Sequence, residues 1–127
     1  MKAKNILLID DNDVDNYITS YTLEKSEMAE NIIIHTSAND ALKFLDEVQN
    51  EPDRIPEYIF LDIRMPEMDG FGFLEEYALF PTTIRNRCTI FMLTSSSDQK
   101  DMARATQYPY VKKFLIKPFD PDMLNEL

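Results

Sequence analysis

The sequence has little glycine, one cysteine and few basic residues. Its only glycines are Gly70 and Gly72, so no Gly-rich loop follows the first apolar run, which disfavours a dinucleotide-binding domain. The single cysteine, Cys88, excludes an intramolecular disulfide and is expected to be a small buried residue of a strand. With 13 Lys and Arg against 23 Asp and Glu, the net charge of −10 argues against direct binding to nucleic acid.

Long hydrophobic runs are absent as well. The first apolar run, Ile6 to Ile9, is too short for a signal peptide or a membrane span. Together with the lone thiol, this favours the cytoplasm and no membrane partner. The 127 residues, of which 44% are hydrophobic, are enough for one core. We therefore expect one domain over residues 1–127.

Short apolar runs alternate with segments at helical spacing. The predicted strands are Asn5–Ile9, Asn31–Thr36, Tyr58–Leu61, Thr89–Leu93 and Phe114–Ile116. A predicted helix follows each strand, over about residues 14–26, 38–48, 71–78, 99–106 and 121–127. Asn12 or Asp13 is positioned to cap the first helix and Asp98 the fourth, whereas Gly70 is expected in a turn with unusual backbone angles.

This alternation predicts an α/β fold with a parallel sheet that is covered by helices on both faces. With five strands and five helices, the leading arrangement is a doubly wound, flavodoxin-like sheet of order 2-1-3-4-5. Ligands of such sheets bind at the carboxyl ends of the strands, where the strand order reverses between strands one and three. Asp10 and Asp11 follow the first strand and Asp62 follows the third, so we expect these acids to converge.

Thr94 and Lys117 directly follow the fourth and fifth predicted strands, at the same edge of the sheet. Two carboxylates about 4 Å apart repel by roughly 4 kcal/mol at an effective dielectric near 20, so a hard cation is expected among the three acids. Mg²⁺ prefers one or two carboxylates, waters and phosphate oxygens. Asp62 is then a candidate nucleophile for phosphoryl transfer, with the Lys117 charge and the Thr94 hydroxyl contacting the phosphoryl oxygens.

Four segments in the right order resemble the receiver domains of bacterial response regulators, and the resemblance covers nearly the whole chain. They are Leu8–Asn12, Leu61–Gly70, Phe91–Ser95 and Phe114–Phe119. The resemblance implies a two-component signalling switch rather than an enzyme, with only weak self-catalysed phosphorylation and dephosphorylation. The implied partners are a histidine kinase or histidine phosphotransfer protein, and a downstream protein bound by the face of helix four, strand five and helix five.

The resemblance also implies a role for each site residue. Asp62 would accept the phosphoryl group, and Thr94 and Lys117 would sense it. Asp11, Asp62 and the backbone carbonyl of Arg64 would bind Mg²⁺ directly, with Asp10 acting through water. The Lys117–Pro118 peptide bond is expected to be cis, the isomer that proline tolerates best.

Three positions depart from the common family pattern. Phe114 stands where the family often has a switch tyrosine, Ser95 replaces a small apolar residue, and Gln107–Val111 replaces a Gly-Ala stretch. The short last helix leaves open a stand-alone regulator and a domain cut from a longer protein.

Two other functions remain as alternatives. One is a pseudo-receiver that works by protein contact alone, which the intact set of Asp11, Asp62, Thr94 and Lys117 disfavours. The other is a Mg²⁺-dependent aspartyl phosphatase; such enzymes carry Asp-x-Asp on strand one together with a cap domain, and 127 residues leave no room for a cap.

Overall fold

The computed structural model describes residues 3–95 and 99–124, and these form one five-stranded parallel sheet. The strand order is β2-β1-β3-β4-β5, which confirms the predicted flavodoxin-like topology. The strands are β1 (Ala3–Ile9), β2 (Ala29–His35), β3 (Tyr58–Leu61), β4 (Thr89–Thr94) and β5 (Val111–Ile116). Cys88 is buried, as predicted, although it lies one residue before β4 rather than within it.

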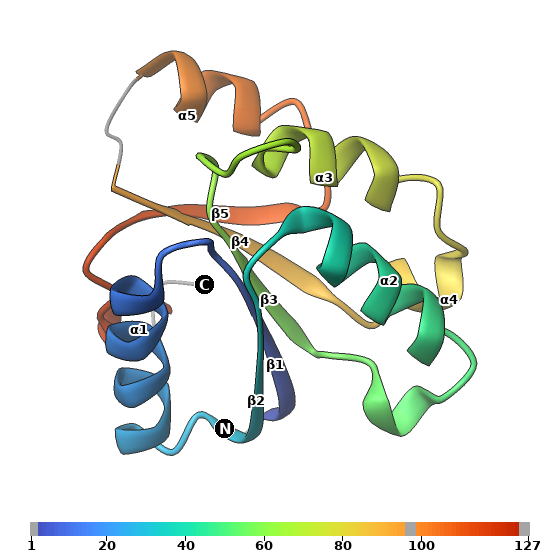
Figure 1. Ribbon diagram of the computed structural model, residues 1–127, viewed down its shortest axis with the longest axis horizontal. Coiled ribbons are helices and arrows are strands. Elements are labelled where there is room, and N and C mark those ends of the chain that lie inside the picture. The colour runs from blue at the N-terminus through green and yellow to red at the C-terminus, as the bar shows by residue number, and fades with distance from the viewer. Residues whose placement is uncertain (1–2, 96–98, 125–127) are drawn as a thin grey trace.

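Helices cover both faces of the sheet, with α1 on one side and α2 and α3 on the other (Figure 1). The helices are α1 (Asp13–Lys25), α2 (Ala38–Val48), α3 (Gly70–Tyr77), α4 (Thr82–Arg85) and α5 (Gln99–Ala105), with 3-10 turns η1 (Pro52–Arg54) and η2 (Pro121–Leu124). The described residues contain five α-helices, which is the predicted number. The short α4 was not foreseen, and the described part of the last predicted helix is the 3-10 turn η2.

Polar side chains start three of the helices, and the predicted cap Asn12 is confirmed. The Asn12 side chain caps α1 by accepting from the Asp15 backbone N–H at 3.0 Å, and Ser37 and Asp69 cap α2 and α3 in the same way. The predicted cap Asp98 lies outside the described residues. No helix in the described ranges is long and apolar enough to cross a membrane.

The two faces of the sheet pack different cores. The larger core joins Leu7 and Ile9 of β1 to apolar residues of α2, α3, α4 and α5. The smaller core lies on the opposite face and includes Ile6 and Leu8, Leu23 of α1, and several aromatic rings. Because successive side chains of a strand point to opposite faces, a continuous apolar run such as β1 supplies both cores.

Helix α1 turns most of its apolar residues outward. Val14, Tyr17, Ile18 and Tyr21 are exposed. The residues that α1 buries are Asn16, Thr19 and Leu23. Helical spacing therefore located this helix correctly, but its apolar stripe is not the face that packs on the sheet.

The departure at Gln107–Val111 has a structural role. Tyr108 stacks on Phe71 with ring centroids 6.0 Å apart, and Tyr110 packs edge-on against Tyr77 at 5.3 Å. The Tyr110 hydroxyl also donates to the backbone carbonyl of Leu74 at 3.3 Å. These contacts attach the segment before β5 to α3.

Candidate functional site

Strand register brings the predicted acids to one point at the carboxyl edge of the sheet. Ile9 of β1 pairs with Leu61 of β3, so the residues that follow them, Asp10 and Asp62, emerge side by side. The Asp62 backbone N–H donates to the Ile9 carbonyl at 2.9 Å, which extends the ladder to the nucleophile candidate itself.

Three carboxylates form a compact oxygen cluster at this edge. Asp10, Asp11 and Asp62 each offer a carboxylate oxygen within 4.8 Å of the others. Asp10 and Asp62 are buried, whereas Asp11 is exposed. An all-oxygen donor set of this kind fits a hard divalent cation and does not fit a soft one. Of the predicted metal ligands, the structure therefore assembles these three side chains.

The Asp10 carboxylate is held from the start of α1. One oxygen, Oδ1, accepts from the Asn12 backbone N–H at 2.9 Å. The buried Asn16 side chain donates to the Asp10 backbone carbonyl at 2.8 Å. Burial of these polar groups is tolerated because each bond replaces one that water would otherwise make.

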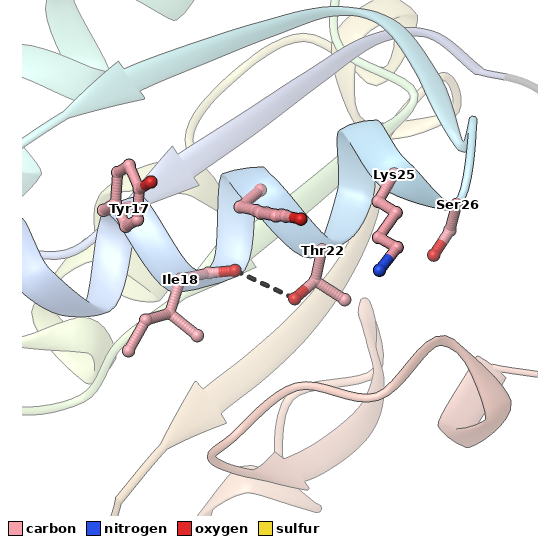
Figure 2. A pocket seen from close by; sticks show the side chains of 6 residues that line it. Tyr17, Ile18, Thr22, Lys25 and Ser26 are labelled. Atoms are coloured by element: carbon pink, nitrogen blue, oxygen red, sulfur yellow. Dashed lines mark hydrogen bonds between the residues drawn. The ribbon is translucent and has the colours of Figure 1, made fainter.

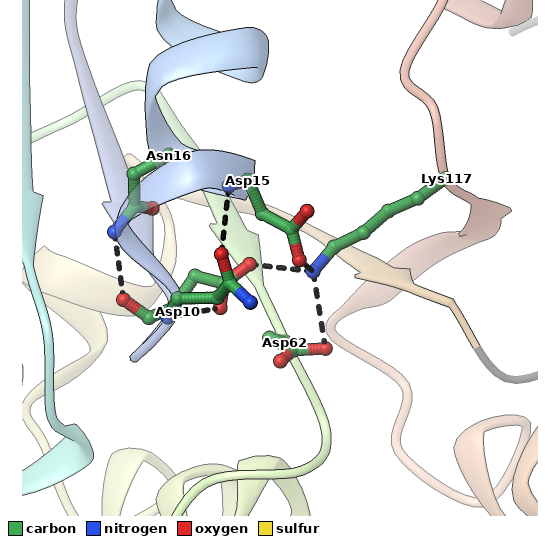
Figure 3. A network of polar contacts seen from close by, with 6 residues as sticks. Asp10, Asp15, Asn16, Asp62 and Lys117 are labelled. Atoms are coloured by element: carbon green, nitrogen blue, oxygen red, sulfur yellow. Dashed lines mark hydrogen bonds and ion pairs between the residues drawn. The ribbon is translucent and has the colours of Figure 1, made fainter.

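Lys117 reaches the cluster from the end of β5 (Figure 3). Its backbone N–H donates to the Thr94 carbonyl at 2.8 Å, which fixes the strand end, and the Lys117–Pro118 peptide bond is cis as predicted. Its ammonium Nζ lies 2.6 Å from Asp10 Oδ2, 2.8 Å from Asp15 Oδ2 and 3.7 Å from Asp62 Oδ1. The carboxylates nearest to this ammonium are thus Asp10 and Asp15, and the candidate nucleophile Asp62 lies farther away.

Burial raises the pKa of Asp62 from 3.8 to about 6, and the neighbouring Asp10 carboxylate adds to this rise. The Lys117 ammonium acts in the opposite direction on the same group. Burial alone would lower the pKa of Lys117, but the bonds from Asp10 and Asp15 outweigh it and raise the value. Lys117 is consequently charged, and Asp62 binds its proton more tightly than an ordinary carboxyl group does.

The loop after β3 links this cluster to α5. Arg64 Nη2 lies 2.6 Å from Asp101 Oδ2 of α5, although most of the Arg64 side chain is exposed. Thr94 is buried at the end of β4, on the same edge as Asp62. The prediction that Arg64 is exposed is therefore right, and its partner Asp101 was not foreseen.

Gly70 does not have the unusual backbone angles that the sequence suggested. It is the first residue of α3, and no described glycine has a positive φ. A Cβ atom at Gly70 would lie 2.5 Å from the Asp62 backbone oxygen and 3.0 Å from the Ile63 Cα. Glycine is needed here because the start of α3 approaches the Asp62 backbone too closely for any side chain.

Sequence reasoning missed two side chains that contact Lys117 or Asp10. Asp15 and Asn16 lie in the first turn of α1, where an acid or an amide is ordinarily explained by capping and the helix dipole. Their spacing of four and five residues after Asp11 was the only available signal, and it has no meaning until α1 is docked beside Lys117, which follows β5. His35, which the sequence indicated to be a packed or surface imidazole, packs against Phe44 at 5.3 Å.

Two of the surface pockets lie along α1. One, of about 240 Å³, opens beside Lys117 and is lined by Asp15, Ile18, Thr19, Ser95, Lys117 and Pro118. The other, of about 320 Å³, runs along α1 past Tyr17, Ile18 and Lys25 (Figure 2). Its lining has no carboxylate, so the acidic cluster and not this pocket is the candidate site for metal and phosphoryl chemistry.

Comparison with known families decides the class of protein. The model of the response regulator receiver domain matches residues 6–127. The chain belongs to this family. Receiver domains are the phosphorylated switch modules of two-component systems, so the fold and the class of function predicted from the sequence are both confirmed.

Individual relatives agree with this assignment. A two-component response regulator from Cytophaga hutchinsonii has a solved structure that is 29% identical, with a TM-score of 0.91 over 99% of this chain and 94% of that chain. Response regulator Rcp1 from Synechocystis sp. is 30% identical over 78% of this chain and 67% of its own length. A solved structure of Rcp1 contains Mn²⁺; it is 28% identical, with a TM-score of 0.74 over 97% of this chain and 87% of that chain.

Other curated relatives are much longer proteins. Histidine kinase CKI1 from Arabidopsis thaliana is 27% identical over 92% of this receiver domain, which spans 11% of that kinase. The receiver domain thus spans only a small part of some of the proteins that it matches.

Proposed function

We propose that this receiver domain, taken as one unit over residues 1–127, accepts a phosphoryl group on Asp62 from a histidine kinase or a histidine phosphotransfer protein. The observation that carries the proposal is the position of Asp62. It is a buried carboxylate at the sheet edge, within 4.8 Å of two further acids and 3.7 Å from a lysine ammonium. Each of these features has a task in phosphoryl transfer to a carboxylate.

The transfer step is a displacement at phosphorus. A carboxylate oxygen of Asp62 forms the new P–O bond, and the P–N bond of the phosphohistidine breaks with its electron pair returning to the imidazole. Lys117 stabilises charge on one phosphoryl oxygen, and the buried Thr94 hydroxyl donates to another. The raised pKa of Asp62, about 6, still leaves it mostly ionised at neutral pH.

We propose Mg²⁺ as the metal at the acidic cluster. Asp11, Asp62 and the Arg64 backbone carbonyl would bind it directly, and Asp10 would support it through water. The oxygen-only donor set and the Mn²⁺ present in a solved structure of Rcp1 support a hard divalent cation. When bound, such an ion neutralises charge that develops on the phosphoryl oxygens.

Phosphorylation by a small donor tests this proposal. Incubation with Mg²⁺ and acetyl phosphate should add one phosphoryl mass, measured by intact-protein mass spectrometry, and Asp62→Asn should abolish the adduct. Asp53→Asn is the matched control, because Asp53 is an exposed carboxylate on the η1 turn. Absence of an adduct on the wild-type protein at saturating donor would favour the pseudo-receiver alternative. Rapid turnover of a phosphomonoester would instead indicate a phosphatase and contradict the assignment as a switch.

The protein phosphodonor is proposed to dock over α1. This helix exposes Val14, Tyr17, Ile18 and Tyr21, and Ile18 also lines the pocket that opens beside Lys117. An exposed apolar stripe of this kind marks an interaction surface, and this one adjoins the pocket beside Lys117, whose ammonium lies 3.7 Å from Asp62.

A kinase panel would identify the donor and then test the docking face. Tyr17→Ser and Ile18→Ser should slow transfer from that donor at least about tenfold by loss of buried apolar contact, yet leave phosphorylation by acetyl phosphate unchanged. Leu79→Ser, which alters a still more exposed apolar residue after α3, serves as the control. Equal slowing with both donors would contradict docking and indicate damage to the site.

The output is proposed to pass through α5, β5 and η2, with Phe114 as a rotamer switch. Thr94 ends β4 on the way to α5, and Phe114 is partly buried against the larger core. Backbone amide shifts with and without a phosphoryl mimic should change at α5 and β5 as well as at the pocket. Changes confined to the pocket would contradict this route. Residence in the cytoplasm, argued from the short apolar runs and the lone thiol, stays a prediction.

A further inference from the structure

We propose that Asp15 is a positioning residue that holds the Lys117 ammonium on the α1 side of the site, in competition with the phosphoryl group on Asp62. This inference rests on the proposed phosphoacceptor role of Asp62. It assigns to α1 a control over how readily the site accepts and keeps a phosphoryl group.

The Lys117 ammonium contacts three carboxylates at different distances. Lys117 Nζ is 2.8 Å from Asp15 and 2.6 Å from Asp10, but 3.7 Å from Asp62 (Figure 3). Charge-assisted N–H···O bonds are about 2.7–2.9 Å long, so the first two contacts are full bonds and the third is not. A phosphoryl oxygen near Asp62 must therefore draw Lys117 toward itself and away from at least one present partner.

Asp15 would remain bound to Lys117 with a metal ion in the acidic cluster. The acidic cluster consists of Asp10, Asp11 and Asp62 and does not include Asp15. A divalent cation in that cluster takes up the negative charge of Asp10 and repels the nearby ammonium. The Asp15 carboxylate then becomes the main anion that holds Lys117 away from Asp62.

The position of Asp15 is fixed by the helix start. Its backbone N–H donates to the Asn12 cap at 3.0 Å, so its carboxylate projects from the first turn of α1. About a third of its side chain is exposed, whereas only 11% of the Lys117 side chain is. Asp15 also lines the pocket of about 240 Å³ beside Lys117, through which a donor could reach the pair.

Titration with beryllofluoride, a mimic of the phosphoryl group, tests the competition. We expect Asp15→Asn to bind beryllofluoride in the presence of Mg²⁺ roughly three- to tenfold more tightly than the wild type, because a neutral amide holds Lys117 less strongly than a carboxylate. Asp15→Glu should restore most of the wild-type affinity. Asp13→Asn is the matched control, since it removes one charge from the same turn at an exposed position. An equal gain in beryllofluoride affinity in Asp15→Asn and Asp13→Asn would show that the change in net charge alone causes the effect, and it would overturn the proposal.

The ¹⁵N resonance of the Lys117 ammonium gives a second readout, in the protein without metal or mimic. In Asp15→Asn it should move toward its position in the beryllofluoride complex, and in Asp13→Asn it should stay. An unchanged resonance together with unchanged or weaker mimic binding would overturn the role of Asp15. If the wild type bound no beryllofluoride at all, the phosphoacceptor proposal would fail instead, and the resonance would still report whether Asp15 holds Lys117.

Discussion

The two sides of the sheet are covered by helices of opposite character. On one side, α2 buries an apolar face of Ala38, Ala41, Phe44, Leu45 and Val48. On the other, α1 buries two polar residues, Asn16 and Thr19, with Leu23 as its one large apolar contribution, and turns its other large apolar residues outward.

The α2 side contributes mainly to the stability of the fold, whereas the α1 side contributes mainly to the candidate site. The α2 side follows the ordinary rule in which an amphipathic helix buries its apolar stripe. On the α1 side, the buried and half-buried polar residues contact Asp10 and Lys117, and the apolar stripe borders the pocket that leads to them. The helix that contributes less to the core is therefore the one that organises the site.

The largest effect should come from the α2 side. Leu45→Ala removes a fully buried side chain from the larger core and should lower the free energy of unfolding by about 2–5 kcal/mol. Denaturant titration measures this value. The matched control is Leu79→Ala, which truncates an exposed leucine and should change stability by less than about 0.5 kcal/mol. A small loss for Leu45→Ala would break the proposed contrast.

Removal of the Asp62 charge is expected to stabilise the protein, because three carboxylates lie close together at this edge of the sheet. The pKa of Asp62 is raised from 3.8 to about 6, so the destabilising effect of its ionisation is absent below 3.8 and develops as the pH rises through about 6. With a chelator present, the free energy of unfolding of Asp62→Asn should exceed that of the wild type by about 1–3 kcal/mol at pH 8. The difference should shrink toward pH 4, as denaturant titration at each pH would measure. A difference that is constant with pH would contradict the burial of this charge.

Gly70→Ala should disturb the point at which α3 meets the site. The new methyl group would press on the Asp62 backbone oxygen, which cannot move without shifting the nucleophile, so we expect a loss of about 1–3 kcal/mol. At Gly72 the nearest atom is the Met68 side chain, which is flexible. Gly72→Ala should be close to neutral in stability, because a gain of about 1 kcal/mol in helix propensity offsets the cost of shifting the Met68 side chain. Thermal unfolding compares the two, and equal losses would contradict the close approach at Gly70.

The smallest effect should be seen on the exposed face of α1. Tyr17→Ser removes a ring that is 72% exposed and should change the free energy of unfolding by less than about 0.5 kcal/mol, although it slows transfer from the protein donor. Calorimetry measures the unfolding of the variant, and a phosphotransfer assay on the same preparation measures the rate of transfer. A loss above 1 kcal/mol would mean that this stripe stabilises the fold after all.

Much of the fold and of the site was predictable because it follows from local pattern. The alternation of strands and helices, the strand order and the convergence of Asp10, Asp11, Asp62 and Lys117 all depend on where apolar runs end. A parallel sheet leaves few ways to order five such runs, so the residues after each strand meet at one edge. These features are encoded within segments of a few residues.

Other features depend on how distant segments pack. The Gly70 prediction was wrong because the constraint is not a turn but an approach of α3 to the Asp62 backbone, which no local pattern records. The outward apolar stripe of α1, the Arg64–Asp101 pair and the Asp15–Lys117 bond likewise join segments far apart in the chain or reflect which face a helix turns to the sheet. Sequence spacing tells which residues share a helix face, but only packing selects the face that is buried. For this protein, that choice made α1 part of the site.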